Sequence, residues 1–189
     1  MPMPVKLRST ELPEVLEIET GLVRDDRGWF AELHSQAMFE AAGFRHDFRQ
    51  DNLSLSAKGT LRGLHYQLEP YGMGKLVRAL KGAVFDVAVD LRRGSPSYGK
   101  WVGRELSQTN RLALWVPVGF AHGFVALEDD TLVLYKCTSI HRPEAERAVH
   151  YADPTIGIRW ALAPTLISPK DAKAPTLAAA EANFEYVGG

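Results

Sequence analysis

Apolar and polar side chains alternate over short stretches of this 189-residue chain. The best example is the segment 84–91, where every second position from Phe85 to Leu91 is apolar. Asp86 and Asp90 share the opposite face of the same segment. A two-residue period is typical of a β-strand, so we expect the apolar face to lie in the core and the aspartate face to lie outside it.

Other strand-like stretches are short, and glycine, proline or paired aspartates separate them at intervals that suit an antiparallel sandwich or barrel. They are residues 15–18, 28–33, 53–56, 75–80, 101–106, 113–116, 123–127 and 132–138. Two segments are expected to be helical: residues 35–42, with Ser35 as N-cap, and the alanine-rich residues 175–184. The pattern therefore predicts an all-β fold with a few short peripheral helices, in one domain spanning residues 1–189.

Composition narrows the class of protein. The 22 Lys and Arg residues nearly balance the 23 Asp and Glu residues, so we expect no nucleic-acid partner. No apolar run approaches the roughly 20 residues that cross a bilayer. Cys137 is the single cysteine, which excludes an internal disulfide framework, and the first residues contain no apolar signal segment. We expect a cytoplasmic protein without a membrane partner.

Three neighbourhoods place polar, aromatic and basic side chains inside otherwise strand-like segments. They are Gln50-Asp51-Asn52, residues 61–67 (LRGLHYQ) and residues 119–124 (GFAHGF). Taken singly, each has a plain interpretation, because a lone histidine in a strand is more often a hydrogen-bonded structural group than a catalyst. Their occurrence together indicates a functional site.

The chain resembles the dTDP-4-dehydrorhamnose 3,5-epimerase family over nearly its whole length, from residues 26–28 (DRG) to residues 168–171 (SPKD). The most specific matches are QDNLS at 50–54, LRGLHYQ at 61–67, DVAVDLRRGSP at 86–96, PVGFAHGF at 117–124 and YKCT at 135–138. The resemblance implies a cupin-type double-stranded β-helix, or jelly roll, and a homodimer that shares its N-terminal strands. It also implies a dTDP-sugar substrate and no cofactor. In that family, C3 and C5 of dTDP-4-dehydro-6-deoxy-D-glucose are epimerised through an enolate to give dTDP-4-dehydro-L-rhamnose.

Four residues match the family's catalytic positions. By that match, His65 is the base that removes a proton from a carbon beside the C4 ketone, and Asp171 is the carboxylate that orients it. A neutral imidazole suits this role, since its reference pKa of about 6.5 leaves it ready to accept a proton. Tyr135 matches the acid that returns a proton to the opposite face, which produces inversion. Lys75 matches the group beside the ketone oxygen, where a fixed ammonium stabilises the enolate.

Further matches fall where the family contacts the nucleotide base, the diphosphate and the sugar. These are Arg27, Glu32, Gln50, Asp51, Asn52, Arg62, His122, His141, Glu146 and Lys170. Arg62 offers a planar pair of donors that suits phosphate oxygens. Asp86 either pairs with His122 as a second His–Asp unit or is a structural acceptor on its strand.

One position departs from the family pattern. Six residues after Tyr135, where the family has a large aromatic side chain that stacks on thymine, this chain has His141. An imidazole stacks less extensively, so the identity of the nucleotide sugar is open. The motifs also leave open an enzyme that epimerises only C3 or only C5 of a related 4-keto-6-deoxy sugar.

Two other classes of cupin make different demands on the same residues. Metal-dependent cupins use an H-x-H motif, but the position two after His65 is Gln67, so a tight transition-metal site is not expected. A catalytically silent sugar-binding cupin would keep Arg62 and lose the base or the acid. Because His65, Asp171 and Tyr135 are all present, the sequence favours an enzyme.

Overall fold

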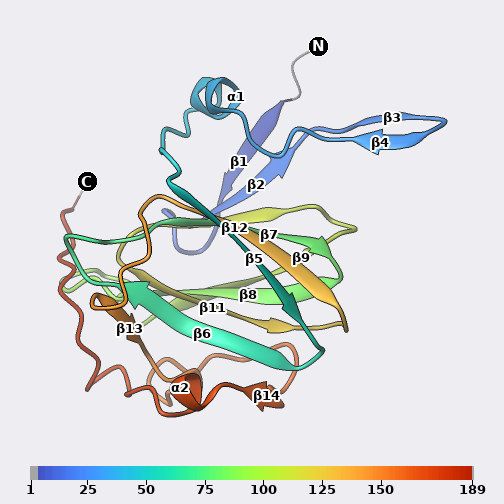
Figure 1. Cartoon of the computed structure of the whole chain (residues 1–189). Coiled ribbons are helices and arrows are strands. Elements are labelled where there is room, and N and C mark those ends of the chain that lie inside the picture. Colours follow the sequence, from blue (N-terminus) through green and yellow to red (C-terminus); the bar gives the residue numbers. More distant parts are fainter. Residues whose placement is uncertain (1–3, 189) are drawn as a thin grey trace.

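Two antiparallel β-sheets dominate the computed structural model, which describes residues 4–188 (Figure 1). The first sheet has the order β1 (Val5–Ser9), β2 (Leu16–Thr20), β10 (Ala113–Val116), β7 (Lys75–Lys81), β12 (Thr131–Cys137) and β5 (Gln50–Ser56). The second has the order β13 (Glu146–Ala148), β6 (Thr60–Gln67), β11 (Phe120–Ala126), β8 (Ala83–Asp90) and β9 (Trp101–Ser107), with β14 (Leu166–Ile167) parallel to β6. Neighbouring strands come from distant parts of the sequence, as in a jelly roll. The predicted all-β jelly-roll fold is confirmed.

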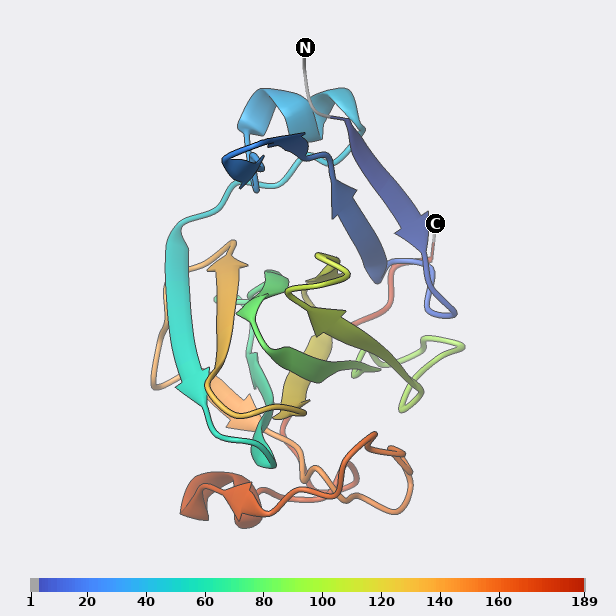
Figure 2. The ribbon, with the colours of Figure 1, turned by 90° about the vertical axis from the view of Figure 1, so that its right-hand side faces the viewer.

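The inward-facing side chains of both sheets form one apolar cluster. Val77 and Val133 belong to the first sheet, and Val84 and Phe124 to the second. Figure 2 shows α1 at one end of this barrel and the C-terminal segment with α2 at the other. Removing such surface from water stabilises the fold by roughly 25 cal/mol per Å². The packed core therefore fixes the positions of the strands that carry polar side chains on their inner faces.

Strand β8 shows that the expected placement of the aspartate face was wrong. Asp86 and Asp90 are fully buried, and Asp86 lies on the same face as Val84, which belongs to the cluster between the sheets. The opposite face, which includes Val87, packs in a second apolar cluster with Phe184 of the C-terminal segment. Both faces are enclosed because the last part of the chain covers the outside of the second sheet.

The two α-helices of residues 4–188 are short, and none of the described helices is long and apolar enough to cross a membrane. Helix α1 (Gln36–Ala41) confirms the helix expected at residues 35–42, although the Ser35 side chain makes no capping hydrogen bond. Helix α2 (Pro169–Ala172) was not predicted; the Ser168 side chain caps it by accepting from the Asp171 N–H.

The helix expected at residues 175–184 is wrong, because this segment consists of turns and extended chain. The Leu177 N–H donates to Asp153 Oδ2 at 2.8 Å, and the Phe184 carbonyl accepts from the Arg93 N–H at 2.9 Å. These contacts and the burial of Phe184 keep the segment in a non-helical conformation against the barrel. Tertiary packing therefore overrides the helix propensity of its alanines.

Strands β1, β13 and β14 and the first strand of a hairpin were not among the expected segments. The hairpin joins β3 (Val23–Asp25) to β4 (Gly28–Phe30), so only the first half of the segment 28–33 is a strand. It projects away from the barrel (Figure 1) and exposes Val23, Trp29 and Phe30. An exposed apolar arm of this kind indicates a surface for association.

Candidate active site

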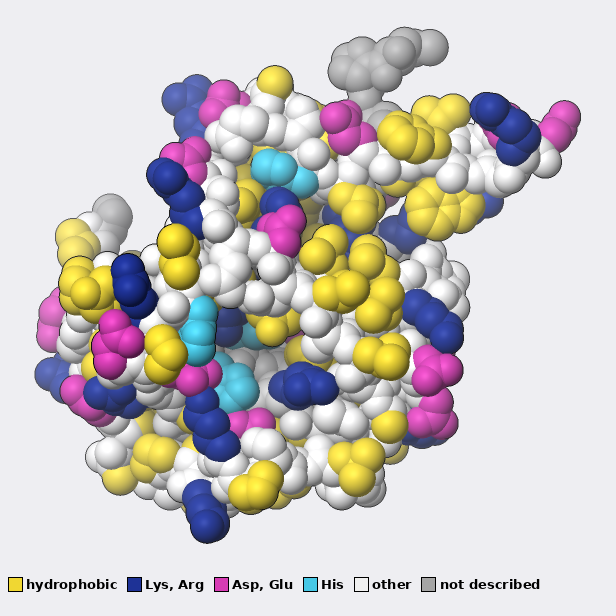
Figure 3. Space-filling model, in the orientation of Figure 1, with side chains coloured by type: hydrophobic (Ala, Val, Ile, Leu, Met, Phe, Trp, Pro, Cys, Tyr) yellow, Lys and Arg dark blue, Asp and Glu magenta, His cyan; other side chains and the backbone are white. Residues whose placement is uncertain are grey.

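Two adjoining cavities, of about 510 and 290 Å³, open on the inner wall of the barrel. His65, Lys75, Tyr135 and Glu146 line both. The larger cavity is completed by Arg62, His122, Lys170, Asp171 and residues of β14, and the smaller by Gln50, Asn52 and His141. Histidine, acidic and basic side chains gather around this hollow in Figure 3. The structure thus brings most of the candidate site residues together.

A β-bulge places two of these side chains on one face of β6. Arg62 and His65 are three positions apart, so a regular strand would point them to opposite faces. The register instead shifts: His65 pairs with His122 on β11, and Arg62 pairs with Phe124. The bulge therefore lets both side chains reach the same cavity.

Two glycines make this bulge possible. Gly63 has a φ of +132°, and a Cβ there would lie 2.5 Å from the Cα of Gly123. A Cβ on Gly123 would in turn lie 2.8 Å from the Arg62 carbonyl oxygen. Any side chain at either position would force β6 and β11 apart, because the two backbones meet without space between them.

His65 and Asp171 form a close pair although they are 106 positions apart. His65 Nε2 lies 2.6 Å from Asp171 Oδ1, and the His65 side chain is 27% exposed while that of Asp171 is 4% exposed. A carboxylate oxygen only accepts hydrogen bonds, so Nε2 carries the proton and Nδ1 holds a free lone pair. When the ring is neutral, this arrangement leaves Nδ1 able to accept a proton.

Asp171 is held as a carboxylate. Burial alone would raise its pKa, but the hydrogen bond and charge interaction with His65, together with the Gly63 N–H, lower the pKa below its usual range. The Gly63 N–H donates to Asp171 Oδ2 at 3.4 Å. The bulge that aligns Arg62 with His65 therefore also contacts the partner of His65.

Tyr135 and Lys75 lie on neighbouring strands of the first sheet, across the barrel from His65. Burial raises the pKa of Tyr135, so its phenol keeps its proton and can donate it. Lys75 is buried, which lowers its pKa, and within residues 4–188 its Nζ donates only to the His65 carbonyl oxygen, at 3.3 Å. An ammonium without a carboxylate partner is available to a negative charge that develops in the cavity.

His122 and Asp86 form a second pair in the barrel wall. His122 Nε2 lies 2.8 Å from Asp86 Oδ1, with the side chains 6% and 0% exposed. Burial lowers the pKa of His122, although contact with Asp86 opposes this effect. Of the two alternatives for Asp86, the structure contains the pair with His122, and Asp86 lies on the inward face of β8.

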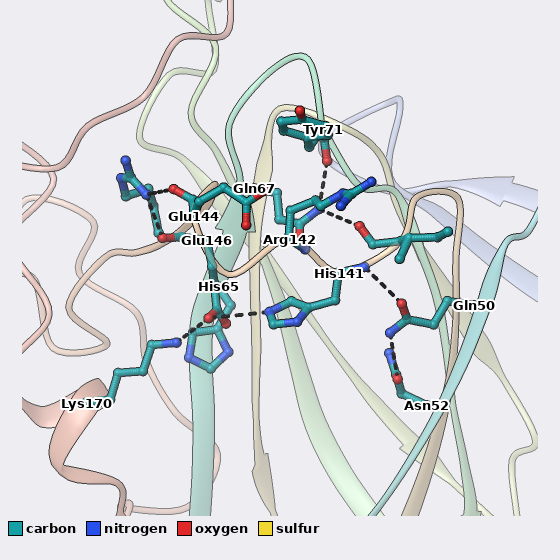
Figure 4. Close-up of polar contacts among 12 residues, drawn as sticks. Gln50, Asn52, His65, Gln67, Tyr71, His141, Arg142, Glu144, Glu146 and Lys170 are labelled. Atoms are coloured by element: carbon teal, nitrogen blue, oxygen red, sulfur yellow. Dashed lines mark hydrogen bonds and ion pairs between the residues drawn. The ribbon is translucent and has the colours of Figure 1, made fainter.

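Glu146 is the hub of polar contacts at the cavity mouth (Figure 4). Its Oε2 accepts a hydrogen bond from Lys170 and lies 3.5 Å from His141 Nε2. Burial would raise the pKa of Glu146, but the Lys170 hydrogen bond lowers it below its usual range. Glu146 therefore stays charged and positions one cation and one imidazole at the opening.

A chain of amides continues from His141 into the barrel. The His141 N–H donates to Gln50 Oε1 at 2.9 Å, and Gln50 Nε2 donates to Asn52 Oδ1 at 2.9 Å (Figure 4). Asn52 Nδ2 then contacts Cys137 Sγ at 3.4 Å. Cys137 is fully buried, and this burial raises the pKa of its thiol.

Three of the expected binding residues lie outside both cavities. Arg27, 90% exposed, pairs with Asp25 on the hairpin. Glu32 is exposed just after β4. Asp51 points to the outer face of β5, where it pairs with Lys136 at 2.8 Å. Gln50 and Asn52, which flank Asp51, line the smaller cavity instead.

Gln67 has a role that its position in the motif did not reveal. Its Nε2 donates to the Tyr71 and Ile140 carbonyls at 2.8 and 3.3 Å, and its Oε1 accepts from the Arg142 N–H at 2.6 Å. It joins two loops beside the smaller cavity, where a metal-binding cupin would have a histidine. Among residues 4–188, no group of three His, Cys, Asp or Glu side chains is arranged to hold a metal ion.

Other lining residues gave little signal in the sequence. Thr60, Met73, Leu166 and Ile167 line the cavities although they belong to no polar cluster along the chain. Leu166 and Ile167 reach the site because β14 pairs in parallel with the start of β6, a long-range contact that local patterns do not encode.

Comparison with known proteins gives a consistent result. The model of the dTDP-4-dehydrorhamnose 3,5-epimerase family matches residues 9–179. A dTDP-4-dehydrorhamnose 3,5-epimerase of Shigella flexneri is 50% identical over 163 residues, covering 86% of this chain and 90% of the relative.

Solved structures show the same likeness. A dTDP-6-deoxy-D-glucose-3,5-epimerase of Legionella pneumophila, in complex with dTDP-4-keto-L-rhamnose, superposes with a TM-score of 0.88 at 45% identity, covering 93% of this chain and 94% of that one. A 3'-monoepimerase of Streptomyces bikiniensis, in complex with dTDP-quinovose, has a TM-score of 0.84 at 33% identity and coverages of 90% and 87%.

Proposed function

The chain belongs to the dTDP-4-dehydrorhamnose 3,5-epimerase family, and from that membership we propose how its side chains carry out the reaction. It is an isomerase that inverts C3 and C5 of dTDP-4-dehydro-6-deoxy-D-glucose and yields dTDP-4-dehydro-L-rhamnose. The observation that supports our assignment of residues is the 2.6 Å contact between His65 and Asp171, in a cavity that Tyr135 and Lys75 also line.

The base in this mechanism is Nδ1 of His65, because its Nε2–H is committed to Asp171. Nδ1 removes a proton from a carbon beside the C4 ketone, and Asp171 stabilises the resulting imidazolium. The electrons move onto the C4 oxygen, where Lys75, which pairs with no carboxylate among the described residues, meets the enolate charge. Tyr135 then returns a proton to the other face of the ring, so the carbon inverts.

The binding groups divide between the two cavities. Arg62 and Lys170 supply cations in the larger cavity, which suits the diphosphate. His141, with Gln50 and Asn52, borders the smaller cavity, which suits the nucleotide base. Because His141 is smaller than the usual aromatic side chain, we expect weaker stacking there.

The experiment that tests this mechanism is incubation with dTDP-4-keto-6-deoxyglucose in deuterated water, followed by NMR of the sugar. Deuterium at both C3 and C5 with an inverted product is the expected result. Label at one carbon would support the single-carbon alternative, to which the similar 3'-monoepimerase gives weight. Binding without any label would identify a silent sugar-binding cupin.

Two variants separate the proton-transfer roles in this assay. His65→Ala should lose solvent exchange almost completely, whereas Tyr135→Phe should still exchange but fail to invert efficiently. Tyr98→Phe, on an exposed turn, is the matched control for the tyrosine change. Unchanged epimerisation by His65→Ala would contradict the mechanism.

We also propose a homodimer, supported by an apolar patch beside the hairpin. Leu53 and Leu55 on the outer face of β5 are 59% and 61% exposed, and Leu80 lies nearby on the same sheet. Trp29 and Phe30 of the hairpin are also exposed, and a group of large exposed apolar side chains of this kind favours an association surface. In such a dimer, the hairpin would carry Arg27 and Glu32 to the partner's cavity.

Sedimentation analysis tests the dimer. The double change Leu53→Glu and Leu55→Glu should give a monomer, because it places charges in the patch. Tyr98→Glu, at an exposed site outside the patch, should leave the dimer intact. A dimer that survives the double change would exclude this surface.

We further propose one catalytic domain over residues 1–189, located in the cytoplasm. A single apolar cluster between the two sheets supports one domain. The single cysteine, Cys137, suits a reducing compartment because no disulfide is needed.

A further inference from the structure

A third cavity, of about 130 Å³, lies outside the two cavities of the candidate active site. It is on the outer face of the first sheet, because Val77 of β7 packs in the core between the sheets and the next residue, Arg78, points the other way. Four segments of one chain supply its walls, which are Thr20, Trp29, Ala31, Leu33, Arg78, Ala79, Leu80, Gln108 and Arg111. The mechanism above uses none of these residues.

Two guanidinium groups line this small space. Arg78 is only 6% exposed, and its Nη1 donates to the Arg111 carbonyl oxygen at 2.7 Å. Its Nη2 is buried and donates to no described residue. Arg111 Nε is likewise buried without an acceptor among residues 4–188. The cavity therefore contains donors that the described part of the chain leaves unused.

The positive charge of Arg78 is not compensated by a carboxylate of the described residues. Burial, and then the neighbouring charge of Arg111, lower the pKa of Arg78 to about 10, and no acidic group of residues 4–188 opposes this effect. At neutral pH the guanidinium still carries its charge. A charge that is removed from water without a partner is costly to the folded state.

Arg92 shows how this chain stabilises another shielded arginine. Its side chain is 14% exposed, and it pairs with Asp90 at 2.8 Å and with Glu14 at 2.9 Å. Arg78 is at least as shielded and has no such pair among the described residues. An anion in the third cavity would give Arg78 what Asp90 and Glu14 give Arg92.

We propose that Arg78 and Arg111 form a binding site for a small free carboxylate, separate from the site of epimerisation. Guanidinium groups present paired donors that match the two oxygens of a carboxylate. Trp29, Leu33 and Leu80 make the remaining walls largely apolar, which suits a short hydrocarbon chain better than a second charge. A volume of about 130 Å³ corresponds to roughly four water molecules of ~30 Å³ each, so the ligand has only a few carbon atoms.

The place of this cavity gives its ligand a structural effect. Trp29 belongs to β4 of the hairpin and Leu33 to the chain that follows it, whereas Arg78 belongs to β7 of the barrel. A carboxylate between them would join the base of the hairpin to the first sheet. The hairpin otherwise projects away from the barrel (Figure 1), so the ligand would fix its direction. The inference does not depend on the proposed function, because no wall of this cavity takes part in it.

The first test is thermal unfolding in sodium propionate, compared with sodium chloride at the same ionic strength. Propionate at ten times its Kd should raise the Tm of the wild type by about 3–5 °C. Arg78→Met keeps the volume and removes the charge, so it should abolish this shift. Without propionate it should be at least as stable as the wild type, because an unpaired buried charge is gone. Arg45→Met, at an exposed position outside the cavity, is the matched control and should keep the shift.

A Tm shift that persists in Arg78→Met would place the anion elsewhere and would overturn the proposal. The second test needs no change at Arg78. Trp29 lines the cavity, so propionate should change its fluorescence and should saturate at the concentration found by unfolding. Trp29→Phe retains an apolar wall and should lose this signal. A wild type without a saturable change in fluorescence would also overturn the proposal.

The third test distinguishes a free carboxylate from an acidic side chain of a second copy of this chain. With a free ligand, the half-saturating concentration of propionate should be the same at low and high protein concentration, and Arg78→Met should leave sedimentation unchanged. If Arg78→Met instead weakened the dimer and propionate had no effect, the carboxylate would belong to the second copy and the small-molecule site would be overturned. None of these measurements uses a nucleotide sugar, so failure of the proposed function would leave their results unaffected.

Discussion

The two histidine–carboxylate pairs share a chemistry and differ in their surroundings. His65 and Asp171 join a barrel strand to a helix 106 positions later, and the imidazole is 27% exposed. His122 and Asp86 lie on adjacent strands, with side chains 6% and 0% exposed. The first pair can therefore exchange protons with a ligand and with solvent, whereas the second is enclosed by the wall.

Charge sets the two pairs apart as well. The ring of His65 lies 2.6 Å from the carboxylate of Asp171, and the carboxylate of Glu146 lines the same two cavities. The ring of His122 has Asp86 but also Lys75, and burial lowers its pKa. The comparison teaches that two His–Asp pairs with the same hydrogen bond can differ in chemistry, because solvent access and nearby cations change which form of each ring is favoured.

The largest expected effect comes from removing each ring in turn. His65→Gln should lower kcat by at least about 1000-fold, within the range for loss of a general base, while His122→Gln should lower kcat/KM only about 10- to 30-fold. Rates of deuterium uptake from labelled solvent check both values. Equal losses in the two variants would remove the distinction between the pairs.

A smaller loss is expected when the carboxylate of the first pair is neutralised. Asp171→Asn should keep the fold but lower kcat about 100-fold, because the imidazolium is no longer stabilised and the tautomer of His65 is no longer fixed. Steady-state kinetics measures this change. Activity equal to that of the wild type would show that His65 needs no orienting partner.

The same variant should change stability in acid. The pKa of Asp171 is lowered in the folded state, so its contribution, about 2 kcal/mol for a charged hydrogen bond, is fully present above the unfolded pKa of about 3.9. It is lost as the pH falls through the lower folded pKa. Urea unfolding of wild type and Asp171→Asn at several pH values should show the difference shrinking in acid. A constant difference would contradict this account.

The smallest effect is expected at the mouth of the cavity. Glu146→Gln should raise KM about fivefold and leave kcat nearly unchanged, because an exposed ion pair such as Lys170–Glu146 contributes only about 1 kcal/mol. Arg147→Gln, the neighbouring change on the same strand, is a control. A large fall in kcat would show that Glu146 takes part in proton transfer at the His65 side.

The sequence indicated which residues gather at the cavity better than it indicated which face of a strand points into the barrel. The alternation at 84–91 separates the two faces of β8 correctly. A local pattern cannot show that the chain's last segment covers the apolar face, which includes Val87, from outside the barrel. The apolar face is therefore expected to point into the barrel and Asp86 to point out of it, which is the reverse of the observed arrangement. The alanines of 175–184 predicted a helix because propensity is local, whereas the contact of Leu177 with Asp153 is not.

The cavity itself could be predicted only in part. The motifs around His65 and His122 drew attention to two strands that do lie side by side. They did not predict that Arg62 and His65 share a face, because a two-residue period places them on opposite sides. The contribution of β14 was equally hidden, since two residues of parallel pairing leave no pattern.

The contact between Gly63 and Gly123 has a consequence for how this enzyme can change over evolutionary time. Because the two glycines occupy one shared space, their substitutions should be strongly non-additive: the first forces the strands apart, and the second then adds little. After one of the two glycines is replaced, a change at the other position cannot restore the close contact between the strands. The shared orientation of Arg62 and His65 therefore depends on keeping both glycines. Substitutions at the mouth of the cavity should be tolerated far more easily than substitutions where β6 meets β11.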